Sequence, residues 1–237
     1  NVLSNQLSGE IPETIGSLSN LTYLNFGFNS FSGNIPESIG NLTELRELYF
    51  SSNQLSGPIP TSIGNLEELI MLSIYNNQIN GEIPETIGNL IQLESLNAGY
   101  NQLEGEIPES IGNLVNLERL WLNYNSLTGE VPSTICNLNL LNWSSYGFEG
   151  DESYLNGNQL CPPYPECIDE NIGYQDILEC DQIQLGDINY DGIISVLDAV
   201  LMVNIILFSE YHQTADMNSD SIIDILDLIQ LIDIILD

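Results

Sequence analysis

The chain has almost no basic residues. Its 237 residues include two arginines, no lysine and one histidine against 34 aspartates and glutamates, and the formal charge is −32. A chain of this charge would repel phosphate polyanions and anionic membrane surfaces. Nucleic acid and acidic membranes are therefore excluded as partners. The acidic excess suits binding of multivalent cations, a salty medium or solubility alone.

Groups for catalysis are also scarce. The single histidine, His212, lies in a polar stretch where we expect a surface role, and no nucleophile, base and orienting group can be assembled around it. Carboxylates are abundant, but neither a spacing nor a pocket singles out two of them as a glycosidase pair. We therefore predict that the protein is not an enzyme.

Long apolar runs are missing as well. No run in the sequence approaches the ~20 residues that a membrane-spanning helix needs, so we predict no membrane span. The chain opens within a repeat at Asn1, and the lack of an export signal therefore carries no conclusion.

What the chain does contain is a repeat of 24 residues. Three residue types recur in phase, namely Asn at 5, 29, 53, 77, 101 and 125, Gly at 9, 33, 57, 81, 105 and 129, and Pro at 12, 36, 60, 84, 108 and 132. A fixed period of this length is typical of a solenoid. The period is lost after Pro132, so we expect a different kind of domain beyond it.

Each repeat ends in the pattern L-x-x-L-x-L, whose alternation predicts a strand with one buried face. Stacked copies would form a parallel sheet with strands ~4.8 Å apart. The predicted interior ladders are Leu24, Leu48, Leu72, Leu96 and Leu120 beside Phe26, Phe50, Ile74, Ala98 and Leu122. The repeated Asn lies between buried positions, so we expect its amide to bond backbone groups of the adjoining turn.

The whole unit, N-x-L-x-G-x-I-P-x-x-I-G-x-L-x-x-L-x-x-L-x-L, resembles the plant-type leucine-rich repeat of receptor ectodomains and of inhibitors of wall-degrading enzymes. The resemblance covers residues 1–145. It implies an α/β repeat solenoid whose parallel sheet is an extracellular recognition surface for a protein or a glycan. The motif is specific for the fold and not for the ligand.

The variable strand positions carry aromatic and amide side chains. Such groups on a solvated sheet are frequent where proteins bind proteins or sugars. The alternative is that they are β-forming residues that only dress the sheet. The candidate ligand-binding residues are Tyr23, Tyr49, Tyr75, Tyr100, Trp121 and Tyr124.

All four cysteines follow the repeats, at Cys136, Cys161, Cys167 and Cys180. An even count at an element boundary predicts two disulfides and an extracellular or cell-surface location, and zinc ligation is the alternative. We assign residues 146–185 to a cap and linker, because the last coil would otherwise expose its apolar ladder. The run N-Q-L-C-P-P-Y-P-E-C resembles the cap that follows plant-type repeats. That resemblance favours Cys161 with Cys167 and leaves Cys136 for Cys180.

Residues 186–237 contain two copies of an acidic loop, 29 residues apart. Oxygen ligands alternate along each copy in the spacing of a calcium loop, so we predict two bound Ca²⁺ ions. The isoleucine of each loop would contribute its backbone carbonyl oxygen. The candidate ligands are Asp187, Asn189, Asp191, Ile193, Ser195 and Asp198 in the first loop and Asp216, Asn218, Asp220, Ile222, Asp224 and Asp227 in the second.

The tandem loops, each followed by a helix and ending in Asp rather than Glu, are similar to dockerin modules, which are small all-α calcium-binding domains. This resemblance implies a cohesin-like partner, and self-association is the alternative. Two features depart from dockerins of cellulose-degrading complexes. Ser221 replaces the loop Gly, and the small polar recognition positions are apolar, namely Val196, Leu197, Ile225 and Leu226.

The helices expected after the loops are apolar nearly all round, whereas a surface helix would show a polar face. They either pack on each other and on the cap or keep one face for a partner.

We predict an extracellular or cell-surface protein of recognition or scaffolding, whose repeats present a binding face and whose calcium module mediates attachment or assembly. The alternative is a structural subunit that polymerises end to end into a filament through the repeat edge at Asn1. Ice binding, which regular repeat surfaces can support, is a third hypothesis.

Overall fold

The computed structural model describes residues 1–144, 152–168, 171–177, 180, 184–190, 192–208, 212–218 and 220–236. The chain divides into two compact units, Asn1–Asp176 and Ile177–Asp237. The first unit contains the repeats together with most of the segment assigned to the cap, and the second contains both acidic loops.

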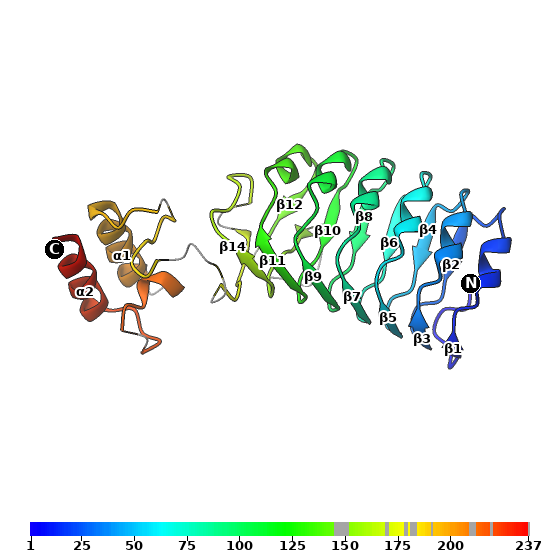
Figure 1. Ribbon diagram of the computed structural model, residues 1–237, viewed down its shortest axis with the longest axis horizontal. Coiled ribbons are helices and arrows are strands. Elements are labelled where there is room, and N and C mark those ends of the chain that lie inside the picture. Colours follow the sequence, from blue (N-terminus) through cyan, green and yellow to red (C-terminus); the bar gives the residue numbers. More distant parts are fainter. Residues whose placement is uncertain are drawn as a thin grey trace. The chain divides into compact units, whose positions relative to one another are not determined.

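The first unit is a stack of coils, and the coils add parallel strands to two sheets (Figure 1). The five-stranded sheet confirms the strand predicted from L-x-x-L-x-L. Its strands are β2 (Tyr23–Asn25), β4 (Glu47–Tyr49), β6 (Met71–Ser73), β8 (Ser95–Asn97) and β10 (Arg119–Trp121).

The seven-stranded sheet was not predicted, because the segment after each Asn was interpreted as a turn. Each of its strands offers few apolar residues and becomes a strand by pairing with the next coil. Its strands are β1 (Ser8–Glu10), β3 (Ser30–Asn34), β5 (Gln54–Gly57), β7 (Gln78–Gly81), β9 (Gln102–Gly105), β11 (Ser126–Glu130) and β14 (Gln159–Cys161).

A short 3-10 helix closes each coil after the I-P step. Proline before each helix holds the backbone extended, with φ of −63 to −75° and ψ of 135 to 145°. The helices are η1 (Glu13–Ser17), η2 (Glu37–Asn41), η3 (Thr61–Asn65), η4 (Glu85–Asn89), η5 (Glu109–Asn113) and η6 (Ser133–Asn137).

The predicted leucine ladders form the core of this unit. Leu48, Leu120 and Phe50 are fully buried, and so are their counterparts in neighbouring coils, except that Phe26 in the second ladder is only partly buried. Each coil therefore covers the apolar side of the last one, as the repeat pattern predicted.

The repeated asparagine bonds the backbone as expected. The Nδ2 of Asn77 donates to the carbonyl oxygens of Phe50 and Ile74, each at 3.0 Å, and to that of Tyr75 at 3.3 Å. Its Oδ1 accepts the N–H of Leu55 at 3.0 Å. One amide thus satisfies buried backbone groups of two coils.

The cap continues this ladder beyond the regular repeats. Asn158 donates to the carbonyl oxygens of Leu122 at 3.0 Å and Leu155 at 2.8 Å, and its Oδ1 accepts the N–H of Leu127 at 3.1 Å. Gln175 then repeats the pattern on Leu155. Their positions, 33 residues after Asn125 and a further 17 on, break the period, so the sequence did not reveal them. The remaining strands of the cap are β12 (Asn142–Trp143) and β13 (Glu152–Ser153).

The predicted disulfide pairing was wrong. Cys136 bonds Cys167, with their Cα atoms 5.7 Å apart. Cys161 and Cys180 are disulfide-bonded as well. The residues after β14 fold back over the last coil and bring Cys167 to Cys136, which a motif resemblance could not decide.

Cys136 takes the place of a glycine that is required in earlier coils. A Cβ at Gly64 would come within 2.5 Å of the carbonyl oxygen of Thr86 in the next coil, and Gly112 meets Thr134 in the same way. The series ends at position 136, where the side chain instead forms the disulfide.

The second unit is all-α, as predicted. It consists of α1 (Val196–Phe208), the 3-10 helix η8 (Gln213–Ala215) and α2 (Ile225–Leu236). Its small core contains Ile188, Met202, Ile205, Ala215, Met217 and Leu231.

Candidate functional site

The outward positions of the five-stranded sheet line up in rows. Tyr23, Glu47, Met71, Ser95 and Arg119 are register partners along one row. Polar groups of this face bond one another: the Tyr49 hydroxyl donates to Glu47 at 2.9 Å, and Ser51 and Ser73 share a hydrogen bond of 2.6 Å. Burial, followed by the Glu47 bond, raises the pKa of Tyr49 to about 12, so its hydroxyl stays protonated at neutral pH.

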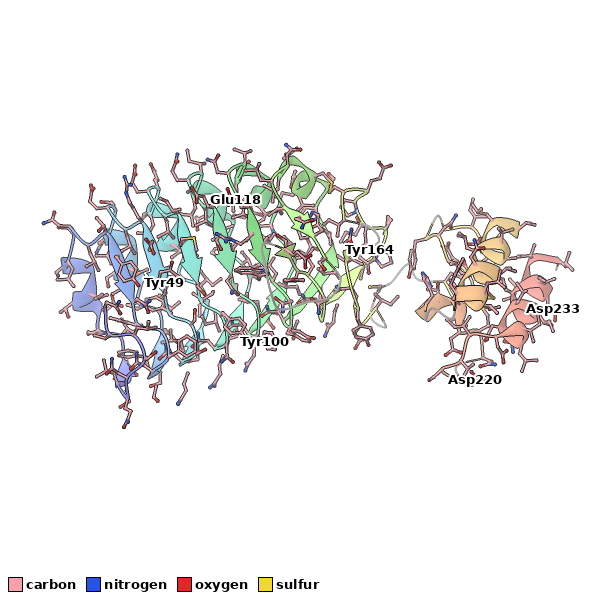
Figure 2. The ribbon with its side chains drawn as sticks, turned by 180° about the vertical axis from the view of Figure 1, so that it is seen from behind. Tyr49, Tyr100, Glu118, Tyr164, Asp220 and Asp233 are labelled. Atoms are coloured by element: carbon pink, nitrogen blue, oxygen red, sulfur yellow. A yellow bond between two sulfur atoms is a disulfide. The ribbon has the colours of Figure 1, made fainter. Side chains whose placement is uncertain are left out.

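Three predicted ligand residues meet just beyond the carboxyl ends of the strands of this sheet. The ring centroid of Tyr100 lies 5.4 Å from that of Tyr75 and 4.5 Å from that of Tyr124. Figure 2 shows Tyr100 at this end of the strands and Glu118 at the opposite end. We call Tyr75, Tyr100 and Tyr124 the tyrosine cluster.

The backbone at two members of this cluster is left-handed, as it is at the same position of the other coils. Tyr100 and Tyr124 have φ of 55° and 54°, and the equivalent positions of earlier coils are filled by Phe28, Ser52 and Asn76. A bulky side chain is rare there, whereas Asn is tolerated. Because this conformation recurs from coil to coil, it belongs to the repeat fold, and the fold does not need an aromatic ring at these positions.

The other predicted aromatic residues lie outside the cluster. Tyr23 and Tyr49 form a separate pair, with ring centroids 5.9 Å apart. Trp121 donates its indole Nε1–H to the carbonyl oxygen of Glu152 at 2.7 Å and is thereby bound to the cap. The sequence analysis assigned Trp121 to the ligand face from its position in the repeat. That position does not reveal a hydrogen-bond partner 31 residues away.

The seven-stranded sheet presents a second surface that sequence reasoning missed. Along each of β5, β7, β9 and β11 the central leucine or isoleucine is fully buried and its two neighbours point outward. The outward residues are almost all Ser, Gln, Asn or Thr. Their recurrence one and three residues after the ladder Asn was the available signal.

In the first acidic loop, the carboxylates of its ends organise the backbone. Asp198, fully buried, accepts the N–H groups of Ile188 at 2.8 Å and Ser195 at 2.8 Å, and Asp187 accepts that of Gly192 at 2.8 Å. Burial would raise the pKa of Asp198, but these N–H bonds outweigh it and lower the pKa below its usual value.

The second loop repeats these contacts. Asp227 accepts the N–H groups of Asn218 at 3.2 Å and Asp224 at 2.9 Å, and Asp216 accepts that of Ser221 at 2.9 Å. Ser221 has φ of 67°, where the first loop has Gly192 at 81°. The two loops are therefore equivalent in backbone as well as in sequence.

Among the described residues, no three His, Cys, Asp or Glu side chains converge on one point. Asp191, a predicted ligand of the first loop, lies outside the described residues. The donor set still fits calcium, because carboxylate, amide and hydroxyl oxygens alternate along both loops. The side chains of Ile193 and Ile222 are exposed, which agrees with a role for their backbone carbonyls alone.

His212 is partly buried in the second unit. Its ring lies 5.5 Å from that of Tyr190, and its Nδ1 is 3.1 Å from the Thr214 hydroxyl. Burial lowers the pKa of His212. The surface role expected for this residue stays a prediction, and the contact with Tyr190 of the first loop was not foreseen.

Comparisons with known families agree with both halves of this architecture. Residues 2–104 match the leucine-rich repeat region family and residues 116–138 match the leucine rich repeat family. The chain is a leucine-rich repeat protein. Residues 185–236 of this leucine-rich repeat protein match the dockerin type I domain family. A comparison with curated proteins finds no match.

Solved structures of plant proteins share the repeat fold. The ectodomain of the Arabidopsis thaliana receptor kinase GASSHO1/SCHENGEN3, in complex with Casparian strip integrity factor 2, is 39% identical over 66% of this chain, with a TM-score of 0.61. The Arabidopsis receptor kinase HAESA, in complex with the peptide hormone IDA and the co-receptor SERK1, is 34% identical over 72%, with a TM-score of 0.63. A plant ice-binding protein is 30% identical over 69%, with a TM-score of 0.58.

The chain spans only part of these relatives, namely 18% of GASSHO1/SCHENGEN3, 28% of HAESA and 61% of the ice-binding protein. Within the part of the chain that the structure describes, no helix has the length and apolar character needed to cross a membrane.

Proposed function

We propose that the protein is an extracellular, non-enzymatic recognition module whose five-stranded sheet binds a protein or glycan ligand at the tyrosine cluster. The contact of three tyrosine rings from successive coils carries this proposal, because the fold accepts Ser or Asn at the positions of Tyr100 and Tyr124. The peptide complexes of GASSHO1/SCHENGEN3 and HAESA and the disulfides of the cap support it.

A matched pair of variants tests the tyrosine cluster. A peptide library displayed on phage is selected on the wild-type protein, and the selected peptides are measured against Tyr100→Asn with Tyr124→Asn. We expect binding to be lost with the double variant and kept by Phe28→Asn, which changes an exposed ring in the same left-handed position of an early coil. Equal binding by all three proteins would refute the assignment.

We further propose that the second unit binds two Ca²⁺ ions through the twelve residues named from the sequence. The ions would supply positive charge that offsets the repulsion of the clustered carboxylates. The exposed apolar residues Val196, Leu197, Ile225 and Leu226 at the two helix starts would face a partner, either a cohesin-like protein or a second copy of the chain. This unit would thereby attach the recognition face to another protein.

End-to-end assembly into a filament stays an alternative prediction. Measurement of molecular size by light scattering, in calcium and in chelator, distinguishes a recognition module from a filament subunit. A calcium-stabilised monomer supports the recognition module, whereas large assemblies support the filament.

A second candidate function is ice binding. It is favoured by the uninterrupted seven-stranded sheet of polar outward residues and by the similarity to the plant ice-binding protein. The test is partition of the whole protein, with calcium, into slowly grown ice. Exclusion of the wild-type protein from the ice would rule this function out.

A further inference from the structure

Resting on the ice-binding candidate, we propose that the ice-binding surface lies on the seven-stranded sheet. It is formed by the residues on either side of the central apolar residue of β3, β5, β7, β9 and β11, together with Gln159 of β14. We call this set of residues the flank array. It comprises Ser30, Ser32, Gln54, Ser56, Gln78, Asn80, Gln102, Glu104, Ser126, Thr128 and Gln159. The strands that carry it follow one another along the solenoid (Figure 1).

The flank array is nearly free of charge in a strongly acidic chain. One of its eleven residues is acidic, although 34 of 237 residues in the chain are Asp or Glu. The acids form the adjoining row of the same sheet, where the side chains of Glu10, Glu82 and Glu106 extend over the glycine of the next strand. A carboxylate binds its own hydration shell. Because the flank array holds only one carboxylate, water on it can adopt the order of an ice lattice.

The array also keeps its polar groups available. In the described residues no side-chain hydrogen bond involves Gln54, Gln78 or Gln102, all of which are exposed, whereas the ladder asparagines are fully used by the fold. Amide and hydroxyl groups both donate and accept hydrogen bonds, as water molecules in ice do. The array therefore matches a lattice of donors and acceptors better than a charged ligand.

What the array lacks argues against a protein partner. It contains no outward aromatic residue or arginine, the side chains that dominate the binding energy of protein interfaces. Its outstanding property is repetition at the strand spacing of about 4.8 Å. Weak contacts that repeat along a rigid surface add together only on a partner that also repeats, and a crystal face is such a partner.

The other faces of the solenoid do not offer this regularity. Along the five-stranded sheet one row runs Tyr23, Glu47, Met71, Ser95 and Arg119, which mixes charge, size and polarity. The 3-10 helices carry an acid in the first turn of η1, η2, η4 and η5. Hydroxyls that recur in these helices are engaged by the fold, as that of Thr86 donates to the carbonyl oxygen of Thr61 at 2.8 Å. The flank array is the repeated row in which Gln54, Gln78 and Gln102 are exposed and, within the described part of the chain, make no such bond.

The test uses the whole protein with calcium and two matched double variants. Gln78→Lys with Gln102→Lys places two charges at the centre of the flank array. The control, Gln92→Lys with Asn113→Lys, adds the same charge at two exposed positions, the first between η4 and β8 and the second at the end of η5. Fractions of each protein in a slowly grown ice hemisphere are measured, together with thermal melting to verify folding.

We expect the array variant to be reduced about tenfold in ice, equivalent to ~1.4 kcal/mol, and the control to equal the wild type. If the wild type enters ice but the array variant does so equally, the surface lies elsewhere and this inference is overturned. If both variants lose binding alike, the effect belongs to net charge and the inference is likewise overturned. Exclusion of the wild type itself would instead refute the ice-binding function.

Discussion

The indole Nε1 of Trp121 donates a hydrogen bond of 2.7 Å to the carbonyl oxygen of Glu152, joining the last strand of the five-stranded sheet to the cap. The parallel bridge between Trp121 and Tyr154 extends the same connection. A residue that the sequence placed on the ligand face thus also closes the end of the solenoid.

Trp121→Ala is therefore expected to destabilise the first unit. The ring is partly buried, so we expect a loss of ~1–3 kcal/mol, below the cost for a fully buried Trp. Trp121→Phe should recover most of the packing and lose only the hydrogen bond, ~1 kcal/mol. Chemical denaturation measures both, and an unchanged midpoint for Trp121→Ala would show that the cap does not depend on this contact.

Asn77→Ala should be among the most damaging single substitutions in the repeats. It leaves the N–H of Leu55 without its side-chain acceptor. It also removes one of the two side-chain donors to the carbonyl oxygens of Phe50 and Ile74, which Asn53 and Asn101 still bond. A buried N–H left unpaired costs ~1–3 kcal/mol, so we expect a loss of ~1–3 kcal/mol. The neighbouring Gln78→Ala, on an exposed side chain, should stay within ~0.5 kcal/mol of the wild type. Equal effects of the two variants would contradict the ladder account.

Ser221→Gly should stabilise the second unit, because Ser221 has φ of 67° and glycine adopts this conformation without a steric cost. We expect a gain of ~0.5–1 kcal/mol after the larger entropy loss of glycine on folding. The converse variant, Gly192→Ala, meets no atom within 4 Å, so any loss of stability there reports backbone strain alone. Thermal unfolding in excess calcium measures both changes, which should have opposite signs.

Calcium should stabilise the second unit. At free calcium 100 times the dissociation constant, linkage adds ~2.7 kcal/mol per site. Asp198→Asn and Asp227→Asn should each remove the gain of one site, since these buried carboxylates join both ends of their loops. Titration calorimetry gives the number of sites. No heat of binding and no loss of stability in chelator would refute calcium binding.

Tyr49 and Tyr154 should lose their protons two pH units above an ordinary tyrosine. Burial, followed by hydrogen bonds to Glu47 and Glu152, raises the pKa of each to about 12. Because the folded pKa lies above the unfolded value of 10.0, the stabilisation is fully present below pH 10 and is lost as the pH rises through 12. Ultraviolet titration of phenolate follows the transition, and Tyr49→Phe should remove one late-titrating group.

The sequence by itself determined the repeat fold and the loops. The buried leucine ladders and the asparagine ladder follow from spacing, because contacts between adjacent coils recur at one sequence separation. The all-α second unit was implied by the resemblance of the tandem loops to dockerin modules. A property that depends only on a residue's position within the repeat can be read from one coil and applied to the next.

Tertiary structure decided the contacts that do not follow the 24-residue period. Asn158 and Gln175 continue the ladder at irregular spacings, Cys136 pairs with Cys167, and Trp121 bonds Glu152 because folding brings distant segments together. The seven-stranded sheet arises from pairing between coils. A single copy of its strand has too few apolar residues to be recognised as a strand from the sequence. The tyrosine cluster also required the fold, because the stacking of coils brings the rings of Tyr75, Tyr100 and Tyr124 together.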